Sequence, residues 1–395
     1  MRFMLIRGLT VWATALLVPA ILSACGGQPS QVTPPAAAPA VVVPKAELAL
    51  APALESAGLP ISTEVGLTLR NGTLKTVMLA DDQGREVSGR LREDATSWVP
   101  DEPLAYAKHY TATAKASGQD GTEVTQTTAF TTMAQPGNRV DSGLYLFDGN
   151  EYGIAMPVVV EFPEGVEDDH RAIVEKRLFV TTDPPQPGSW AWTSHLQVMY
   201  RAPEYWTPDT KITVRAALAG VPMGGGKYGD QDRRATVSIA SNKVELFIDN
   251  ATKSLTVHEN GTATRQMPVS LGKASTPSSS GTMVIMDKRV QTVFDTTGEP
   301  GDQYRADISY AQRITWGGEF IHAAPWSVGD QGVNNVSHGC VNMSWGDAEW
   351  LFGLTHIGDP VTVRGTEQGL ESGNGFTAWN QSWSEHLKGS ALPGR

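Results

Sequence analysis

Short runs of alternating apolar and polar residues recur from about residue 44 onward, and many of them end at Gly, Pro, Asn or Asp. A period of two residues is typical of β-strands with one face in a core and one in solvent. The 40 Gly and 25 Pro among 395 residues supply turns between such strands and disfavour long helices. The sequence therefore predicts a mostly β protein, and its length predicts two or three globular units.

The first unit is expected over residues 45–134. Alternating residues at 65–69 and 77–79 predict two strands, and the Asn71-Gly72 pair between them is typical of a tight hairpin turn. This pattern indicates a small sandwich of immunoglobulin type, and nothing in the stretch suggests catalysis.

A second immunoglobulin-like unit is expected over residues 135–240. Pro157 should place its strand at a sheet edge or a bulge, because proline lacks the amide that a central strand donates. Gly224-Gly225-Gly226 should be a hairpin tip, since no Lys-Ser/Thr or predicted helix follows as a phosphate loop requires. The expected strands cover residues 154–162, 174–181, 192–201 and 211–217.

A third, mostly β unit is expected over residues 241–366. Ser344 should cap a short helix that runs through Phe352, because Asp347 stands three positions after it, as in a capping box. Further strands are expected at 244–249 and 254–258, which should form a hairpin, and at 361–363.

The C-terminal segment, residues 367–395, carries Trp379 and Trp383 in an otherwise polar context. Two large aromatic side chains in a polar tail indicate a docked segment rather than a free end. The expected partner of both rings is the third unit.

An export signal is expected over residues 1–24. Arg2 and Arg7 form a positive start, and the apolar run that follows is short for a membrane span. It ends in Leu-Ser-Ala-Cys25, which resembles the lipobox of bacterial lipoproteins, so Cys25 is expected to carry lipid. A plain signal peptide or a short membrane anchor is the alternative. The Pro- and Ala-rich residues 25–44 would tether the protein to the outer face of the cell membrane.

Charge and cysteine content limit the classes of function that this chain can have. The formal charge of −11 and the lack of a Lys/Arg run argue against a nucleic-acid partner. The chain has two Cys, so once Cys25 carries lipid, Cys340 has no disulfide partner. Exported proteins usually pair their cysteines, and an unpaired exported thiol is therefore a candidate for chemistry.

Cys340 lies in the hexapeptide Ser337-His338-Gly339-Cys340-Val341-Asn342, and His322 precedes it in Phe320-Ile321-His322-Ala323-Ala324-Pro325-Trp326. A thiol with a pKa of about 8.5 needs a base beside it to act as a nucleophile. Gly339 would let consecutive amides face a developing oxyanion. A buried Cys with a satisfied His is one alternative. Zinc held by His322, His338 and Cys340 is another, although structural zinc takes four ligands.

Together these motifs resemble those of the L,D-transpeptidases of peptidoglycan cross-linking, and most closely the multidomain mycobacterial and actinobacterial type. The resemblance is sharp over residues 241–364 and weaker elsewhere. It implies that Cys340 is the nucleophile and His322 its base, with the Ala323 carbonyl holding the other ring nitrogen. Many relatives have Ser at that position, and a backbone contact should tolerate Ala. The amides of Gly339 and Cys340 would hold the oxyanion.

The resemblance also implies a substrate pocket. Tyr304 matches a pocket tyrosine that assists the oxyanion, and Met286 matches a methionine in the loop that closes over the donor. Residues 288–303 form a longer segment than the resemblance leads us to expect, which leaves the shape of the lid open. The other implied pocket residues are Ser337, His338, Asn342 and Trp326. For Trp326, as for Trp345, packing is favoured over a contact with substrate.

The implied reaction is acyl transfer through a thioester. The thiol would attack a tetrapeptide donor stem, release D-Ala and pass the acyl group to a diaminopimelate-type amine, forming a 3→3 cross-link. No metal or organic cofactor is implied, and carbapenem β-lactams would acylate the same thiol. An L,D-carboxypeptidase, a protein–peptidoglycan ligase and a non-catalytic wall-binding lipoprotein remain alternatives.

Overall fold

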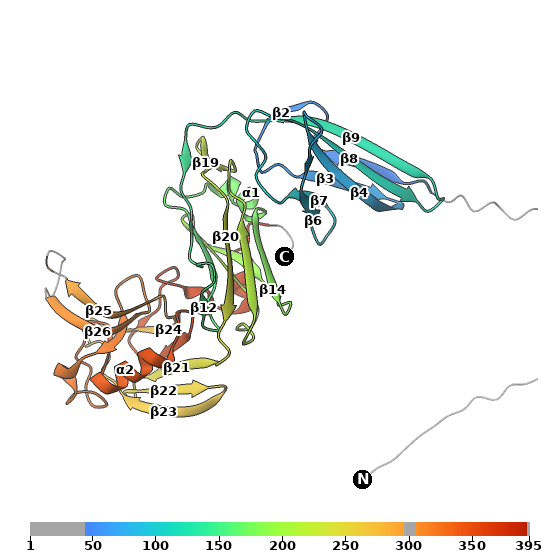
Figure 1. Ribbon diagram of the computed structural model, residues 1–395. Coiled ribbons are helices and arrows are strands. Elements are labelled where there is room, and N and C mark those ends of the chain that lie inside the picture. The colour runs from blue at the N-terminus through green and yellow to red at the C-terminus, as the bar shows by residue number, and fades with distance from the viewer. Residues whose placement is uncertain (1–43, 296, 298–304, 393–395) are drawn as a thin grey trace, which may run out of the picture. The chain divides into compact units, whose positions relative to one another are not determined.

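The computed structural model describes residues 44–295, 297 and 305–392. Short strands dominate these residues, which confirms the mostly β prediction (Figure 1). In these ranges no helix is long and apolar enough to cross a membrane. The predicted signal segment, Cys25 and nearly all of the tether lie outside the described residues, and so does Tyr304.

The first domain is a sandwich of two sheets. One sheet has the order β1 (Glu47–Ala51), β3 (Val65–Arg70), β7 (Ser97–Pro100) and β6 (Gly89–Leu91). The other has the order β2 (Ser56–Leu59), β9 (Glu123–Thr132), β8 (His109–Gly118), β4 (Gly72–Asp81) and β5 (Glu86–Val87). Buried Val65, Leu79 and Phe130 contribute to the core between them.

The hairpin predicted at Asn71-Gly72 is wrong. The strands on either side, β3 and β4, are both present but belong to different sheets. Asn71 has a φ of 56°, so a sharp turn does occur there, but it carries the chain from one sheet to the other. Local turn chemistry was read correctly, whereas the pairing depended on partners far away in the sequence.

The second domain is also a sandwich, around buried Phe162, Met199 and Trp206. Its sheets have the order β11 (Gly143–Leu144), β13 (Val158–Glu161), β16 (Gln197–Arg201), β15 (Ser189–Ser194), and the order β12 (Glu151–Tyr152), β20 (Arg233–Ile239), β17 (Lys211–Ala216), β14 (Leu178–Asp183). A small third sheet has the order β10 (Arg139–Val140), β19 (Lys227–Gly229), β18 (Pro222–Gly224), which confirms the tri-glycine hairpin tip.

Three predictions in this domain are corrected. Residues 192–201 form a hairpin of β15 and β16 rather than one strand, and its His195-Leu196 turn carries no Gly or Pro signal. Val174 lies in α1 (Arg171–Glu175), which follows the 3-10 turn η1 (Asp168–His170), and the strand begins only at Leu178. Strand β13 pairs on both sides and is therefore not an edge strand. Pro157 stands just before its first residue, so the amide that proline lacks is not required for the pairing.

The third domain is built on two sheets. One has the order β23 (Thr262–Pro268), β22 (Ser254–Glu259), β21 (Val244–Asp249), β29 (Pro360–Arg364), β24 (Ser279–Val284), β30 (Gln368–Gly369). The other has the order β25 (Asp287–Asp295), β26 (Arg305–Arg313), β27 (Phe320–Ala323), β28 (Val341–Met343). The predicted β21–β22 hairpin is confirmed.

Helix α2 (Trp345–Leu354) packs beside this second sheet and begins at the predicted cap. The Asp347 amide donates to Ser344 Oγ over 3.2 Å, and the helix runs two residues beyond Phe352. Buried Leu351 and Ala348 join Ile321 and Val341 in the core, which holds β27 and β28 in place.

The C-terminal segment is docked, but Trp379 and Trp383 do not pack where they were predicted to. The indole of Trp379, in the 3-10 turn η3 (Thr377–Trp379), donates to the Ala155 carbonyl over 2.7 Å. Trp383 opens α3 (Trp383–Lys388), and both rings flank Arg201. Ala155 and Arg201 belong to the second domain, so these contacts of the two rings lie there. The same segment also touches the third domain, because Asn380 Oδ1 accepts from the Thr282 amide over 3.0 Å.

Candidate active site

The two motifs meet on neighbouring strands. β27 and β28 pair in parallel, with His322 opposite Asn342 and Ile321 opposite Val341. Opposite residues of a pair project from the same face, and positions two apart on a strand share a face. Cys340 lies in the bend immediately before β28, so the pairing brings the nucleophile candidate beside the strand that carries His322.

The thiol of Cys340 is buried and lies among backbone groups. Its Sγ is 3.8 Å from the Gly318 carbonyl oxygen. Burial raises the pKa of Cys340 to about 12, opposed by a backbone hydrogen bond from Phe320, while the charge of Glu319 raises it further. At rest the sulfur is therefore a protonated thiol.

His322 is also buried and holds one tautomer. Its Nδ1 donates to the Ala323 carbonyl over 2.9 Å, the contact that the resemblance implied. Because a carbonyl only accepts, Nδ1 carries the proton and Nε2 is left as the basic nitrogen. Burial lowers the pKa of His322 to about 4, although the Ala323 hydrogen bond raises it. The imidazole is therefore neutral at pH 7.

Ser337 shapes the turn before the thiol. Its hydroxyl donates to the Cys340 carbonyl over 2.6 Å and accepts from the Gly339 amide over 3.2 Å. Ser278 Oγ donates to the Gly339 carbonyl over 2.7 Å, and Gly339 has a φ of 115°, which favours glycine. The Gly339 amide is thus engaged in this structure, and its role in holding an oxyanion stays a prediction.

Asn342 and Trp326 belong to the same site but differ in exposure. The Asn342 amide is buried and donates to Ser327 Oγ over 3.1 Å, which ties β28 to the 3-10 turn η2 (Pro325–Ser327) after His322. Trp326 is 61% exposed, and its ring centroid lies 6.1 Å from that of His322. This exposure argues against the expected packing role of Trp326, and its contact with substrate stays a prediction.

Two further predicted pocket residues, His338 and Met286, have neighbours of their own. His338 is exposed and its Nε2 lies 3.1 Å from Lys273 Nζ. Met286 is buried in the core cluster that includes Phe376 of the C-terminal segment. Its contact with substrate stays a prediction.

Two residues near the site were not singled out from the sequence. Phe294 of β25 packs edge-on against His322, with ring centroids 5.6 Å apart, and so helps to bury it. Glu319 lies immediately before β27, next to the carbonyl that contacts Sγ. Its only sequence signal was a single charge between Gly317-Gly318 and an apolar strand.

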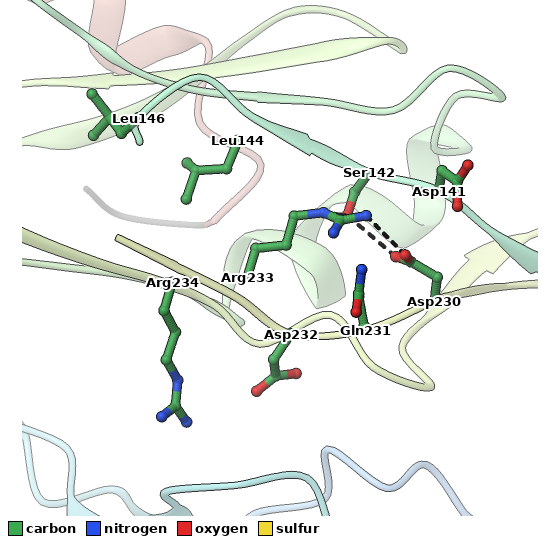
Figure 2. Close-up of a pocket in the computed structure, with 9 residues that line it drawn as sticks. All are labelled: Asp141, Ser142, Leu144, Leu146, Asp230, Gln231, Asp232, Arg233 and Arg234. Atoms are coloured by element: carbon green, nitrogen blue, oxygen red, sulfur yellow. Dashed lines mark hydrogen bonds and ion pairs between the residues drawn. The ribbon is translucent and has the colours of Figure 1, made fainter. Parts of the chain in front are cut away.

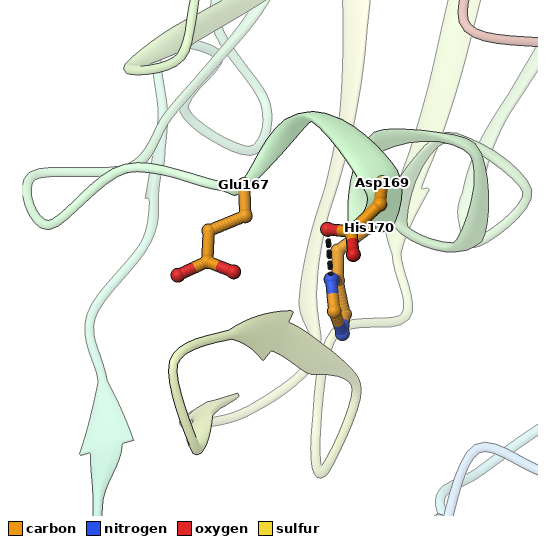
Figure 3. A group of neighbouring side chains, drawn as sticks. All are labelled: Glu167, Asp169 and His170. Atoms are coloured by element: carbon orange, nitrogen blue, oxygen red, sulfur yellow. Dashed lines mark hydrogen bonds and ion pairs between the residues drawn. The ribbon is translucent and has the colours of Figure 1, made fainter.

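Two other features of the described residues lie in the second domain. A pocket of about 550 Å³ is lined largely by charged side chains, and Arg233 within it is paired with Asp230 over 2.8 Å (Figure 2). Glu167, Asp169 and His170 bring possible metal-ligand atoms within 4.8 Å of one another (Figure 3). Neither contains the thiol, and we assign no site to either.

Comparison with known proteins finds matches to two protein families. Residues 243–363 match the L,D-transpeptidase catalytic domain, and residues 56–222 match a bacterial Ig domain. L,D-transpeptidase 2 of Mycobacterium tuberculosis (strain CDC 1551 / Oshkosh) is 33% identical over 96% of this chain and 95% of its own. L,D-transpeptidase 5 of M. tuberculosis (strain ATCC 25618 / H37Rv) is 33% identical over 98% of this chain and 85% of its own.

A solved structure of an L,D-transpeptidase in complex with imipenem is 32% identical, with a TM-score of 0.48, and spans 58% of this chain and all of that one. The catalytic-domain match includes both His322 and Cys340. With a relative 33% identical along nearly its whole length, the chain belongs to the L,D-transpeptidase family.

Proposed function

We propose that this chain cross-links peptidoglycan by acyl transfer from Cys340. The observation that supports this best is the parallel pairing of β27 with β28, which brings the bend containing the buried Cys340 beside the strand of His322. The Ala323 carbonyl, by fixing the proton on Nδ1, leaves Nε2 to accept the thiol proton.

The first half-reaction forms a thioester. As Sγ attacks the carbonyl carbon of the penultimate stem residue, its proton moves to His322 Nε2 and a C–S bond forms. The C–N bond to the terminal D-Ala then breaks, and the His322 proton passes to the leaving nitrogen. The second half-reaction reverses this order with a stem-peptide amine, and its product is a 3→3 cross-link.

The proton transfer must accompany the attack. With a pKa of about 12 for Cys340 and about 4 for His322, a resting thiolate–imidazolium pair is disfavoured. A neutral pair avoids holding two charges in a buried site, and charge develops only when the substrate carbonyl can share it.

The test is the intact mass of the protein after carbapenem treatment. The lactam carbonyl mimics the donor, so the wild type should gain one adduct, which peptide mapping should place at Cys340. Cys340→Ser should gain none, because an alcohol is harder to ionise than a thiol. An adduct that persists in Cys340→Ser would show that the nucleophile is misassigned.

The acceptor is tested by product analysis. With a diaminopimelate-containing tetrapeptide as donor and acceptor, we expect a cross-linked dimer and free D-Ala. A tripeptide product alone would favour the carboxypeptidase alternative, and a product formed only on a protein amine would favour the ligase. No reaction with either donor or carbapenem would favour the non-catalytic, wall-binding protein.

A further inference from the structure

Glu319 is close to Cys340 both through its neighbours in the sequence and through its own side chain. Along the chain it stands between Gly318, whose carbonyl contacts Cys340 Sγ at 3.8 Å, and Phe320, whose backbone hydrogen-bonds the thiol. Across the site, its Cγ would lie 3.5 Å from a Cβ built on Gly339. The side chain therefore passes over the residue that immediately precedes the nucleophile.

One oxygen of the carboxylate is anchored. Glu319 Oε1 accepts from the Ser279 amide over 3.0 Å and from its hydroxyl over 2.9 Å. Ser279 is 1% exposed and belongs to β24, while Glu319 itself is only partly buried. Two hydrogen bonds to a rigid strand hold the carboxylate in one orientation.

The carboxylate has no cationic partner within residues 44–295, 297 and 305–392. Burial raises the pKa of Glu319, and its negative charge in turn raises the pKa of Cys340. A fixed anion beside the thiol thus opposes formation of the thiolate. A charge that hinders the first half-reaction indicates a use in the second, in which an amine must approach the acyl carbon bound to the same sulfur.

We propose that Glu319 binds the primary ammonium group of the acyl acceptor and removes its proton. This inference rests on the proposed transpeptidation. It assigns to Glu319 the choice between an amine and water as acceptor, because water offers no positive charge to the carboxylate.

The step is balanced as follows. The acceptor ammonium pairs with the Glu319 carboxylate, and one proton moves to the carboxylate, which leaves a neutral amine. The amine lone pair attacks the thioester carbon, a C–N bond forms, and the C–S bond breaks with its electron pair on Cys340 Sγ. A second nitrogen proton passes through His322 to the sulfur, and Glu319 releases its proton to solvent.

The experiment compares the wild type with Glu319→Gln, Glu319→Asp and Glu123→Gln. Gln keeps an oxygen for Ser279 and removes the charge, Asp keeps the charge on a shorter stem, and Glu123 is an exposed control in the first domain. Each protein is acylated by a donor tetrapeptide. Partition between aminolysis and hydrolysis is then followed over a range of amine concentrations and pH. Two acceptors are compared, a tetrapeptide bearing a side-chain amine and the free amino acid D-methionine. The comparison shows whether the enzyme prefers a stem-peptide amine or a free amino acid.

Glu319→Gln should lose at least about 10-fold in aminolysis relative to hydrolysis and need more amine for half-saturation. Its acylation by a carbapenem should be faster than that of the wild type, which also shows that it folds. Glu319→Asp should recover part of the aminolysis, and Glu123→Gln should match the wild type. Equal partition in Glu319→Gln and wild type would overturn the role of Glu319 alone. A wild type that hydrolyses the donor and accepts neither amine would overturn the proposed transpeptidation as well.

Discussion

Burial shifts the pKa values of the two residues proposed to react, His322 and Cys340, in opposite directions. The pKa of His322 falls to about 4 and that of Cys340 rises to about 12, since each charged form is costly to hold away from water. Between these values both groups are neutral. The pH dependence of acylation should report this.

Carbapenem acylation by the wild type should therefore be nearly constant from about pH 5 to about pH 9. Below that range His322 becomes protonated and cannot accept the thiol proton, so the rate should fall. Stopped-flow absorbance at each pH, corrected for spontaneous hydrolysis of the drug, measures this. A rate that climbs with a midpoint of about 8.5 would mean that free ionisation of the thiol precedes attack.

Substitutions at the base and at its support should separate the two roles. His322→Ala should slow acylation by roughly 10²–10⁴, the range for loss of a general base. Ala323→Ser should change the rate little, because the contact to Nδ1 uses the backbone carbonyl. Acylation rates of both variants measure these effects, and circular dichroism checks that each variant is folded. A large loss in Ala323→Ser would show that the side chain matters at this position.

At the scale of elements, a buried cation is one of the groups that hold the C-terminal segment to the second domain. Arg201 is 2% exposed and lies 4.5 Å from the Trp379 ring and 5.2 Å from the Trp383 ring. It donates to the carbonyls of Ala378 and Gln381 over 2.9 and 3.0 Å. The positive charge is thus shared among ring faces and carbonyl dipoles rather than with a carboxylate.

Arg201→Met should lower the free energy of unfolding by on the order of 3 kcal/mol, because it removes the ring contacts and leaves buried carbonyls unpaired. Urea denaturation followed by tryptophan fluorescence measures this. Arg85→Met, at a side chain that is 69% exposed, is the matched control and should cost under about 1 kcal/mol. Equal stabilities of the two Met variants would contradict a stabilising role for Arg201.

Truncation after Gly375 should likewise lower the melting temperature of the protein and reduce its activity.

His386 makes the same segment sensitive to acid. It is fully buried, its Nε2 donates to the Ser189 carbonyl over 2.9 Å, and its Nδ1 lies 3.2 Å from the Gln381 amide. Burial lowers its pKa to about 4, the Ser189 contact opposes this, and the charge of Arg201 adds to the lowering.

Between about pH 6.5 and pH 4 the unfolded chain binds a proton at His386 that the folded chain does not. Stability from this group is therefore complete above pH 6.5 and is lost as the pH falls, by roughly 1–3 kcal/mol. His322 contributes in the same direction. Melting temperatures of wild type and His386→Gln from pH 7.5 to 4.5 isolate the His386 share. Parallel curves for the two proteins would contradict it.

At the scale of the whole molecule, a lipid at Cys25 would determine where the chain acts. We propose that it holds the chain on the outer face of the cell membrane, with residues 25–44 as a tether. The wild type should partition with membranes and carry diacylglycerol on an N-terminal Cys25, whereas Cys25→Ala should lose both properties. Mass spectrometry of the mature N-terminus measures this, and an unmodified terminus at another residue would contradict the lipoprotein prediction.

Local features of the sequence were enough to place many strands, the turn positions and the cap at Ser344. These depend on residues within a few positions of one another, whose spacing and backbone preferences are written directly in the chain. The Cys340 and His322 motifs were also recognisable, because close backbone approach and a base near a thiol require particular residue types.

Tertiary structure alone decided which distant groups meet. It placed the strands around Asn71-Gly72 in different sheets and docked Trp379 on the second domain. It also brought Glu319 over Gly339, where the charge of its carboxylate raises the pKa of the Cys340 thiol. Side-chain burial and pairing are set by partners that can be tens to hundreds of positions away, so no local pattern specifies them. The sequence by itself determined many of the elements and the candidate pair of Cys340 and His322, and packing determined their partners, protonation and charge.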